Sequence, residues 1–174
     1  MQATIRNRQT ILRCFVPHST PFPDSDGFFV ELDRKALSAP PGQRNGIPVL
    51  LDGAPIGDLF DRAFGAKVGE VAAGDTIATP RVGQPEHQQQ FAEAGYVFDF
   101  HLPAALAPTA KRLASKPGAG VRLGFHPSGG QWTISSNPGP QFRERVYRAS
   151  SARLSGIAIT TGESNHGTSV CVIE

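Results

Sequence analysis

The chain has 174 residues, of which 39% are hydrophobic and 18% are charged, a composition typical of a soluble globular protein with one core. Its net charge of +2 does not favour nucleic acid as a partner. The polar N-terminus has no signal-peptide pattern, and no apolar run approaches the ~20 residues of a membrane span. We therefore expect residues 1–174 to form a single domain made in a reducing cytoplasm, with no membrane partner.

Glycine and proline are abundant and fall between short apolar runs. With 19 glycines and 15 prolines, the sequence favours many short strands over a helical bundle. Residues 3–16 and 27–33 are expected to form a strand pair, connected by the proline-rich segment 17–24. A loop rich in proline and glycine follows at 38–46.

The middle of the chain continues this pattern. Residues 47–51 predict a short buried strand, in which Pro48 indicates a sheet edge or a strand start. A second strand pair is expected over 55–64 and 67–72, with its turn near Gly65.

The remaining elements include the one predicted helix. Residues 86–90 are polar and predict a helical turn or an exposed loop, whereas 96–102 is the clearest strand of the sequence. An apolar stripe predicts a helix over about 104–115. Five more strands are expected, at 119–126, 131–136, 142–150, 153–160 and 168–173. Together these elements predict a mainly β fold, a closed or nearly closed antiparallel barrel with one main helix.

The arginines gather near the two ends of the chain. We expect them to lie on solvated strand faces; the alternative is a basic edge that docks onto an acidic protein or onto packaged nucleic acid. They are Arg6, Arg8 and Arg13 in the first group, and Arg143, Arg145, Arg148 and Arg153 in the second.

Cys14 and Cys171 are the only cysteines, and both lie in apolar, strand-like runs at opposite ends of the chain. Two cysteines placed in this way predict buried free thiols rather than a disulfide framework or a metal site.

The histidines give no metal-binding pattern. No two of the five histidines are spaced as H-x-x-x-H or H-x-H, so we expect no zinc site. The sequence also contains no phosphate-binding glycine loop. No cofactor is expected. The five are His18, His87, His101, His126 and His166.

Two pairs of polar residues are candidates for acid–base or nucleophilic chemistry. His126 and Ser128 lie close together before Gly129-Gly130, but Ser128 in this context is more typical of a hairpin turn. Asp99 and His101 share the polar face of the 96–102 strand. We expect this second pair to be exposed polar residues, with an acid–base pair as the alternative.

Several short motifs occur in an order typical of one protein family. An early strand is followed by Phe28-Phe29-Val30-Glu31-Leu32, then by the run from Ile47 to Gly57 with Pro55-Ile56-Gly57 at its end. Later come Gly120-Val121-Arg122-Leu123-Gly124-Phe125 and the strand Ala152–Thr160. In this order the chain resembles the tailed-phage prohead maturation proteases, whose barrel is similar to that of the herpesvirus assemblin proteases.

The resemblance breaks at each position that would carry catalysis. Where the family has its histidine, this chain has Asp52 or Gly53, depending on a one-residue shift in register. Arg122 replaces the serine, and Gly156 replaces the acidic residue of the last strand. Arginine stays protonated and is no nucleophile, and glycine can neither accept a proton nor orient a base. We therefore expect a pseudo-enzyme that has lost the chemistry of the family.

The resemblance implies a non-enzymatic structural protein of a phage or phage-like particle, assembled in the host cytoplasm and located in the virion. It would be a capsid cement or decoration protein, a minor capsid protein or an assembly protein. Its partners would be the major capsid protein, other virion proteins and further copies of itself. Two alternatives stay open. One is an active maturation protease with relocated residues, Ser128 or Ser115 with His126 or His101, and the other is an unrelated β-barrel binding module.

Overall fold

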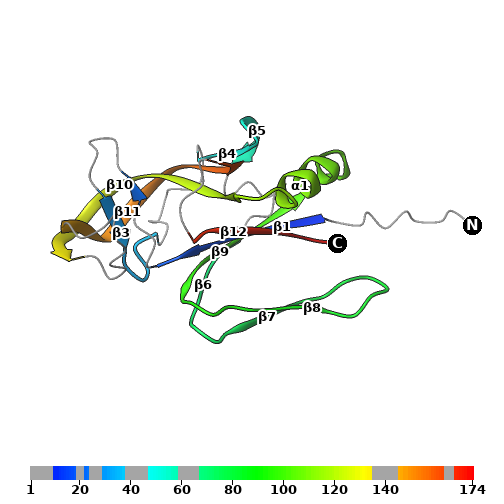
Figure 1. Ribbon diagram of the computed structural model, residues 1–174, viewed down its shortest axis with the longest axis horizontal. Coiled ribbons are helices and arrows are strands. Elements are labelled where there is room, and N and C mark those ends of the chain that lie inside the picture. Colours follow the sequence, from blue (N-terminus) through cyan, green and yellow to red (C-terminus); the bar gives the residue numbers. More distant parts are fainter. Residues whose placement is uncertain are drawn as a thin grey trace, which may run out of the picture.

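The computed structural model describes residues 10–18, 22–23, 29–37, 47–58, 67–134, 145–162 and 167–174. Within these ranges the fold is mainly β and contains one short helix (Figure 1). The helical segment is a 3-10 turn, η1 (Ala104–Leu106), followed by α1 (Ala107–Ala114). The strands are β1 (Thr10–Pro17), β2 (Phe22–Pro23), β3 (Phe29–Leu32), β4 (Pro48–Leu51), β5 (Ala54–Asp58), β6 (Lys67–Val71), β7 (Thr76–Thr79), β8 (His87–Gln90), β9 (Gly95–Leu102), β10 (Ala119–Ile134), β11 (Arg145–Thr161) and β12 (Ser169–Ile173).

The first sheet has the strand order β12-β1-β9-β6, and all its neighbouring strands are antiparallel. Leu12 of β1 lies opposite both Val172 and Phe100, and Cys14 lies opposite Phe98. Because residues two apart on a strand share a face, these side chains all point to the same side of the sheet. Leu12, Cys14, Phe98 and Phe100 are completely buried there.

The second sheet is built on the long strands β10 and β11. β10 pairs with β11 along one edge, and β11 uses its other edge for β3 near one end and for β4 near the other, within the order β2-β3-β11-β4-β5. Both of these last pairings are parallel, with Tyr147 opposite Val30 and Ile157 opposite Val49. Figure 1 shows the β10–β11 hairpin arching over the first sheet.

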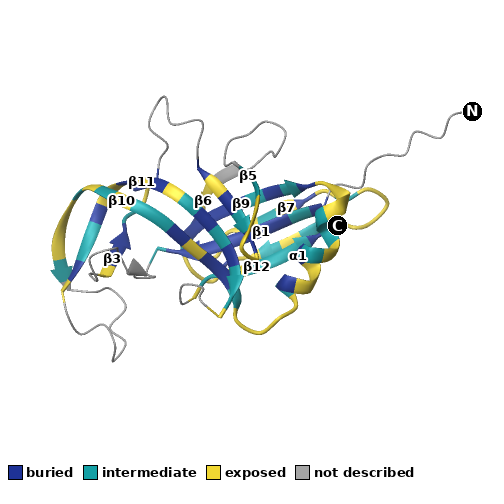
Figure 2. Ribbon diagram, turned by 90° about the horizontal axis from the view of Figure 1, so that it is seen from above, coloured by how far each residue is buried: buried dark blue, intermediate teal, exposed yellow. Residues whose placement is uncertain are grey.

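The main core lies between the two sheets. Leu51, Ile157 and Ile159 from the second sheet belong to the same buried cluster as Phe98 and Phe100 from the first. α1 adds its buried residues Ala110 and Leu113 to this cluster. In Figure 2 the buried positions follow the central strands, whereas the end of the β10–β11 hairpin farthest from α1 is largely exposed.

A third layer, the β7–β8 hairpin, covers part of the opposite face of the first sheet. Phe15, Val71, Phe91 and Val97 form a small second cluster there, with Ile77 of β7 packed against it. The rings of Phe15 and Phe91 lie 5.1 Å apart between centroids. This contact anchors the segment after β8 to β1.

The mainly β prediction is confirmed, as are the strand at 96–102 and the helix near 104–115. The expected closed antiparallel barrel is not found: the described residues form separate sheets, and two pairings of β11 are parallel. β11 is long enough to pair along one edge with both β3 and β4, which come from different parts of the chain.

Several local predictions were wrong. The early strand pairs with β9 and β12 rather than with β3, and β5 pairs with β4 rather than with β6. Residues 87–90 form a strand instead of a helical turn. The four strands expected between 119 and 160 are two long ones, because bulges at Gly124/Phe125 and Pro127–Gly130 let β10 continue through its glycines. The loop at 38–46 and the turn near Gly65 lie outside the described residues.

Candidate functional site

The three positions that the resemblance equates with catalytic residues lie on neighbouring strands or directly after one of them. Arg122 of β10 lies opposite Ala158 of β11, and Gly156 of β11 lies opposite Gly124. Asp52 and Gly53 form the turn after β4, where the Asp52 N–H donates to the Ile159 carbonyl at 2.9 Å. Both turn residues have positive φ, 51° and 84°.

The side chains at these positions do not reproduce a histidine–serine pair. Arg122 is exposed and carries a guanidinium, which is no nucleophile, Gly156 has no side chain, and Asp52 carries an exposed carboxylate in its turn. A Cβ built at Gly156 would lie 3.6 Å from the Pro48 carbonyl oxygen, an ordinary contact, so packing does not require glycine there.

The alternative catalytic residues do not form a serine–histidine pair. The Ser128 hydroxyl is hydrogen-bonded to the Ser151 hydroxyl at 2.8 Å. His126 lies opposite Arg153 on β11. The expected hairpin turn at Ser128 was wrong, because Ser128 is the extra residue of a bulge inside β10.

Ser115 and His101, the other two alternative residues, lie at the end of α1 and on β9. Ser115 caps the end of α1, where its hydroxyl donates to the Arg112 carbonyl at 2.9 Å. His101 lies opposite Ile11 on β1, and its Nδ1 is buried without a hydrogen-bond partner. A nucleophile needs a base within hydrogen-bond reach, and the described contacts provide none.

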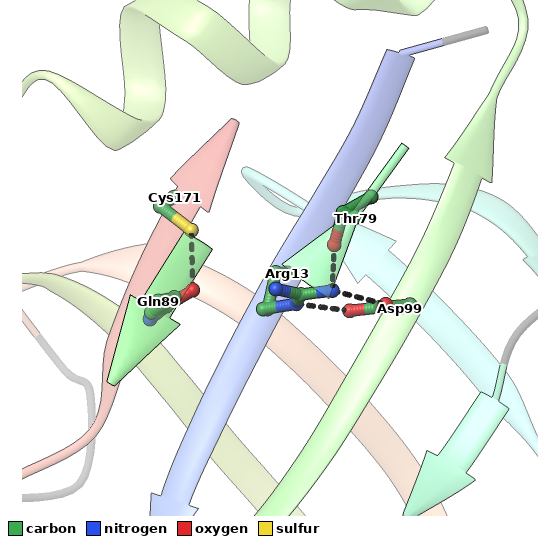
Figure 3. Close-up of polar contacts among 5 residues, drawn as sticks. All are labelled: Arg13, Thr79, Gln89, Asp99 and Cys171. Atoms are coloured by element: carbon green, nitrogen blue, oxygen red, sulfur yellow. Dashed lines mark hydrogen bonds and ion pairs between the residues drawn. The ribbon is translucent and has the colours of Figure 1, made fainter. Parts of the chain in front are cut away.

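A buried polar cluster, which the sequence did not predict, lies between the first sheet and the β7–β8 hairpin (Figure 3). Arg13 donates from Nε to Asp99 Oδ1 and from Nη2 to Asp99 Oδ2, each at 2.8 Å. Nη2 also donates to Thr79 Oγ1 at 2.8 Å. Beside this group, the Cys171 thiol donates to Gln89 Oε1 at 3.5 Å.

The register of the strands brings the residues of this cluster together. Cys171, Arg13 and Asp99 lie opposite one another on β12, β1 and β9, so their side chains share the face that the β7–β8 hairpin covers. Arg13 is only 2% exposed and Asp99 is 18% exposed. The prediction of solvated arginines is therefore wrong for Arg13, and the prediction of an exposed Asp99 is wrong too. Arg6, Arg8, Arg143 and His166 lie outside the described residues.

Electrostatics favour the charged form of Arg13. The hydrogen bonds to Asp99 raise the pKa of the guanidinium further above its ordinary value, against the opposing effect of burial. One nitrogen, Nη1, is buried without a partner. The cluster holds a structural ion pair whose bidentate geometry connects β1 with β9, and the hydrogen bond from Arg13 to Thr79 connects β1 with β7.

The two cysteines are free thiols, as predicted, although Cys171 is only partly buried. β1 and β12 are paired, but Cys14 lies opposite Val170 while Cys171 lies opposite Arg13, which places the two side chains on opposite faces of the sheet. Burial raises the pKa of both thiols, and for Cys171 the neighbouring Arg13 opposes this effect.

His18 directly follows β1 and is half-buried. Its ring packs edge-on against Tyr96, with centroids 4.6 Å apart, and neither ring nitrogen has a hydrogen-bond partner. Burial lowers the pKa of His18. Burial also raises the pKa of Tyr96 to about 12, and the Tyr96 hydroxyl donates to the Asp33 carbonyl at 2.5 Å.

Across the described ranges, no three His, Cys, Asp or Glu side chains gather in a way that would hold a metal ion. No helix in this part of the chain is long and apolar enough to span a membrane. No protein-family model, curated protein or solved structure matches the chain.

Proposed function

We propose that this protein is a non-enzymatic structural component of a phage or phage-like particle, which docks onto the capsid shell as a cement, minor capsid or assembly protein. One observation carries the non-enzymatic part. The positions that the resemblance equates with the protease's histidine, serine and acidic residue hold Asp52 or Gly53 in the turn after β4, Arg122 on β10 and Gly156 on β11.

The capsid as partner comes from the family resemblance, and the surface of the protein supports docking onto another protein. Trp132 of β10 is 49% exposed, and its ring packs edge-on against Tyr147 with centroids 5.6 Å apart. Phe29 of β3 is 37% exposed on the same sheet, and Arg145 is exposed at the end of β11. Tryptophan, tyrosine and arginine are the residues that most often carry binding energy at protein interfaces.

Co-expression with the major capsid protein of the same particle tests the proposal. We expect intact, uncut shells that co-purify with this protein, and the same result with Ser128→Ala and with His126→Ala. Cleavage of the capsid protein by the wild type that either substitution abolishes would contradict the proposal and establish the relocated protease. Uncut shells without the bound protein would instead favour an unrelated binding module.

A further inference from the structure

Positive charge is concentrated on the β10–β11 hairpin. Its two strands hold four of the 17 lysine and arginine residues of the chain and none of the 15 aspartates and glutamates. The small net charge of the chain conceals this local excess. A surface that carries only one sign of charge attracts a partner of the opposite sign.

The solvent face of this hairpin carries a continuous polar strip, which we define as Arg122, His126, Ser128, Ser150, Ser151, Arg153 and Ser155. All seven residues are exposed. His126 lies opposite Arg153, so the imidazole and the guanidinium are direct cross-strand neighbours. Within the described part of the chain, Arg153 has no ion-pair partner.

Glycines leave the serine hydroxyls of the strip uncovered. A Cβ at Gly124 would lie 2.8 Å from the Ser155 hydroxyl, and a Cβ at Gly129 would lie 3.0 Å from that of Ser151 and 3.5 Å from that of Ser150. Any other residue at Gly124 would displace the Ser155 hydroxyl. The strip therefore combines two arginines with exposed serine hydroxyls, of which those of Ser128 and Ser151 are hydrogen-bonded to each other.

We propose that the polar strip binds the phosphate backbone of a nucleic acid, without reading its sequence. Arginine and serine side chains are among the groups that most often contact phosphate oxygens in protein–DNA complexes. From Arg122 to Ser128 the strip extends roughly 20 Å along the strands, which is long enough for several consecutive phosphates.

The composition of the strip favours nucleic acid over an acidic protein. The buried centre of a protein interface is apolar and rich in aromatic residues. The large hydrophobic residues that are exposed in the described ranges are Phe29, Val82 and Trp132, and none belongs to the strip. Because the strip contains no phenylalanine, tyrosine or tryptophan for base stacking, we expect binding that is electrostatic and independent of sequence. The inference does not depend on the capsid proposal.

Arg148 is excluded from the strip because it already faces two carboxylates. It lies opposite Glu31 of β3, and its Nε is 3.7 Å from Asp33 Oδ1. It therefore provides an internal comparison within the same hairpin, since its charge is already partly neutralised.

Fluorescence anisotropy with a labelled single-stranded oligonucleotide of mixed sequence, titrated at several salt concentrations, tests the inference. We expect binding by the wild type that weakens steeply with salt. Arg153→Gln should weaken it several-fold and lower the slope of log K against log salt by about 0.7, the value for one lost phosphate contact on a single strand. Arg122→Gln provides a second, independent variant with the same expected change.

Substitutions of the serines distinguish the contribution of hydrogen bonding to binding from the contribution of charge. Ser128→Ala with Ser151→Ala removes both partners of one hydrogen bond and leaves no unpaired donor. We expect weaker binding with an unchanged salt slope, because a neutral donor releases no counterion. Arg112→Gln, an exposed arginine on α1, is the matched control and should bind like the wild type.

Several results would overturn the inference. Among them are absence of binding by the folded wild type at low salt, an unchanged affinity and slope for both arginine variants, and loss of binding in Arg112→Gln that equals the loss in Arg153→Gln. Poly-glutamate that displaces the oligonucleotide equally well per unit charge would also overturn it, since the strip would then recognise acidic protein rather than phosphate.

Discussion

Arg13 and Asp99 form a bidentate ion pair across β1 and β9, with both nitrogen–oxygen distances at 2.8 Å, beneath the β7–β8 hairpin. Arg13 occurs in the otherwise apolar run Ile11–Pro17, and Asp99 occurs between Phe98 and Phe100. Burying either charge without its opposite charge would cost free energy, so burial of the one depends on the presence of the other.

Asp99→Ala should therefore destabilise the protein by about 3 kcal/mol, because it leaves the buried guanidinium without its counter-charge. Chemical denaturation followed by circular dichroism measures this change. Lys111→Ala is the control, since it removes the exposed ion pair between Lys111 and Glu174 and should cost less than about 0.5 kcal/mol. Equal effects of the two substitutions would show that the Arg13–Asp99 pair is not buried.

Thr79→Val should loosen the β7–β8 hairpin. Valine keeps the shape of threonine but removes the oxygen that accepts from Arg13 Nη2, a hydrogen bond to a charged group worth about 1.5 kcal/mol or more. Hydrogen exchange read by mass spectrometry should become faster in residues 76–90 and change little in β9. Thr76→Val, at an exposed position of the same strand, should leave the exchange unchanged.

Gly95→Ala should destabilise the first sheet by about 2 kcal/mol or more through overpacking. A Cβ at this position would overlap the Val16 carbonyl oxygen and would lie 2.6 Å from Phe15 Cε2. Gly69→Ala on the neighbouring strand β6 is the matched control, because a Cβ there meets no atom within 4 Å. Thermal melting of the two variants compares them, and equal melting temperatures would contradict this packing.

Stability should fall as the pH drops below about 6.5, the ordinary pKa of histidine, because burial holds the pKa of His18 lower in the folded state. Below that pH the unfolded chain takes up a proton that folded His18 resists, so the folded state loses free energy relative to the unfolded one. Glu70 and Asp33 oppose this shift, and Arg34 adds to it.

Denaturation midpoints measured from neutral to mildly acidic pH test this dependence. His18→Phe, which keeps an aromatic ring against Tyr96, should reduce the loss of stability in acid. His126→Asn changes an exposed histidine and should preserve it. An identical acid sensitivity in wild type and His18→Phe would rule out His18 as its source.

The sequence was sufficient to predict the individual strands with strong apolar patterns, but not how they pair. Tyr96, Phe98 and Phe100 alternate clearly enough to define β9. By contrast, β1 pairs with β9 and β12 rather than with a strand near it in sequence, and that choice depends on contacts over more than 80 residues. Local patterns carry no information about such pairings.

The polar cluster was missed because its members lie on five different strands. Arg13 and Asp99 are each the single charged residue in an apolar strand, and this was the feature of the sequence that indicated a buried ion pair. Thr79 and Gln89 gave no such indication, because β7 and β8 are short and polar. The polar strip on β10 and β11 could not be predicted either, because the bulges that place Ser128 beside Ser151 cannot be located from residue types alone.

Sedimentation of purified capsid shells with this protein tests the structural role most directly. The wild type should sediment with uncut shells, and Trp132→Ser should stay largely in the supernatant. Val82→Ser, which changes another exposed apolar residue, on the β7–β8 hairpin, should sediment like the wild type. A wild-type protein that stays in the supernatant, or a Trp132→Ser variant that sediments fully, would contradict docking onto the shell through the end of the β10–β11 hairpin.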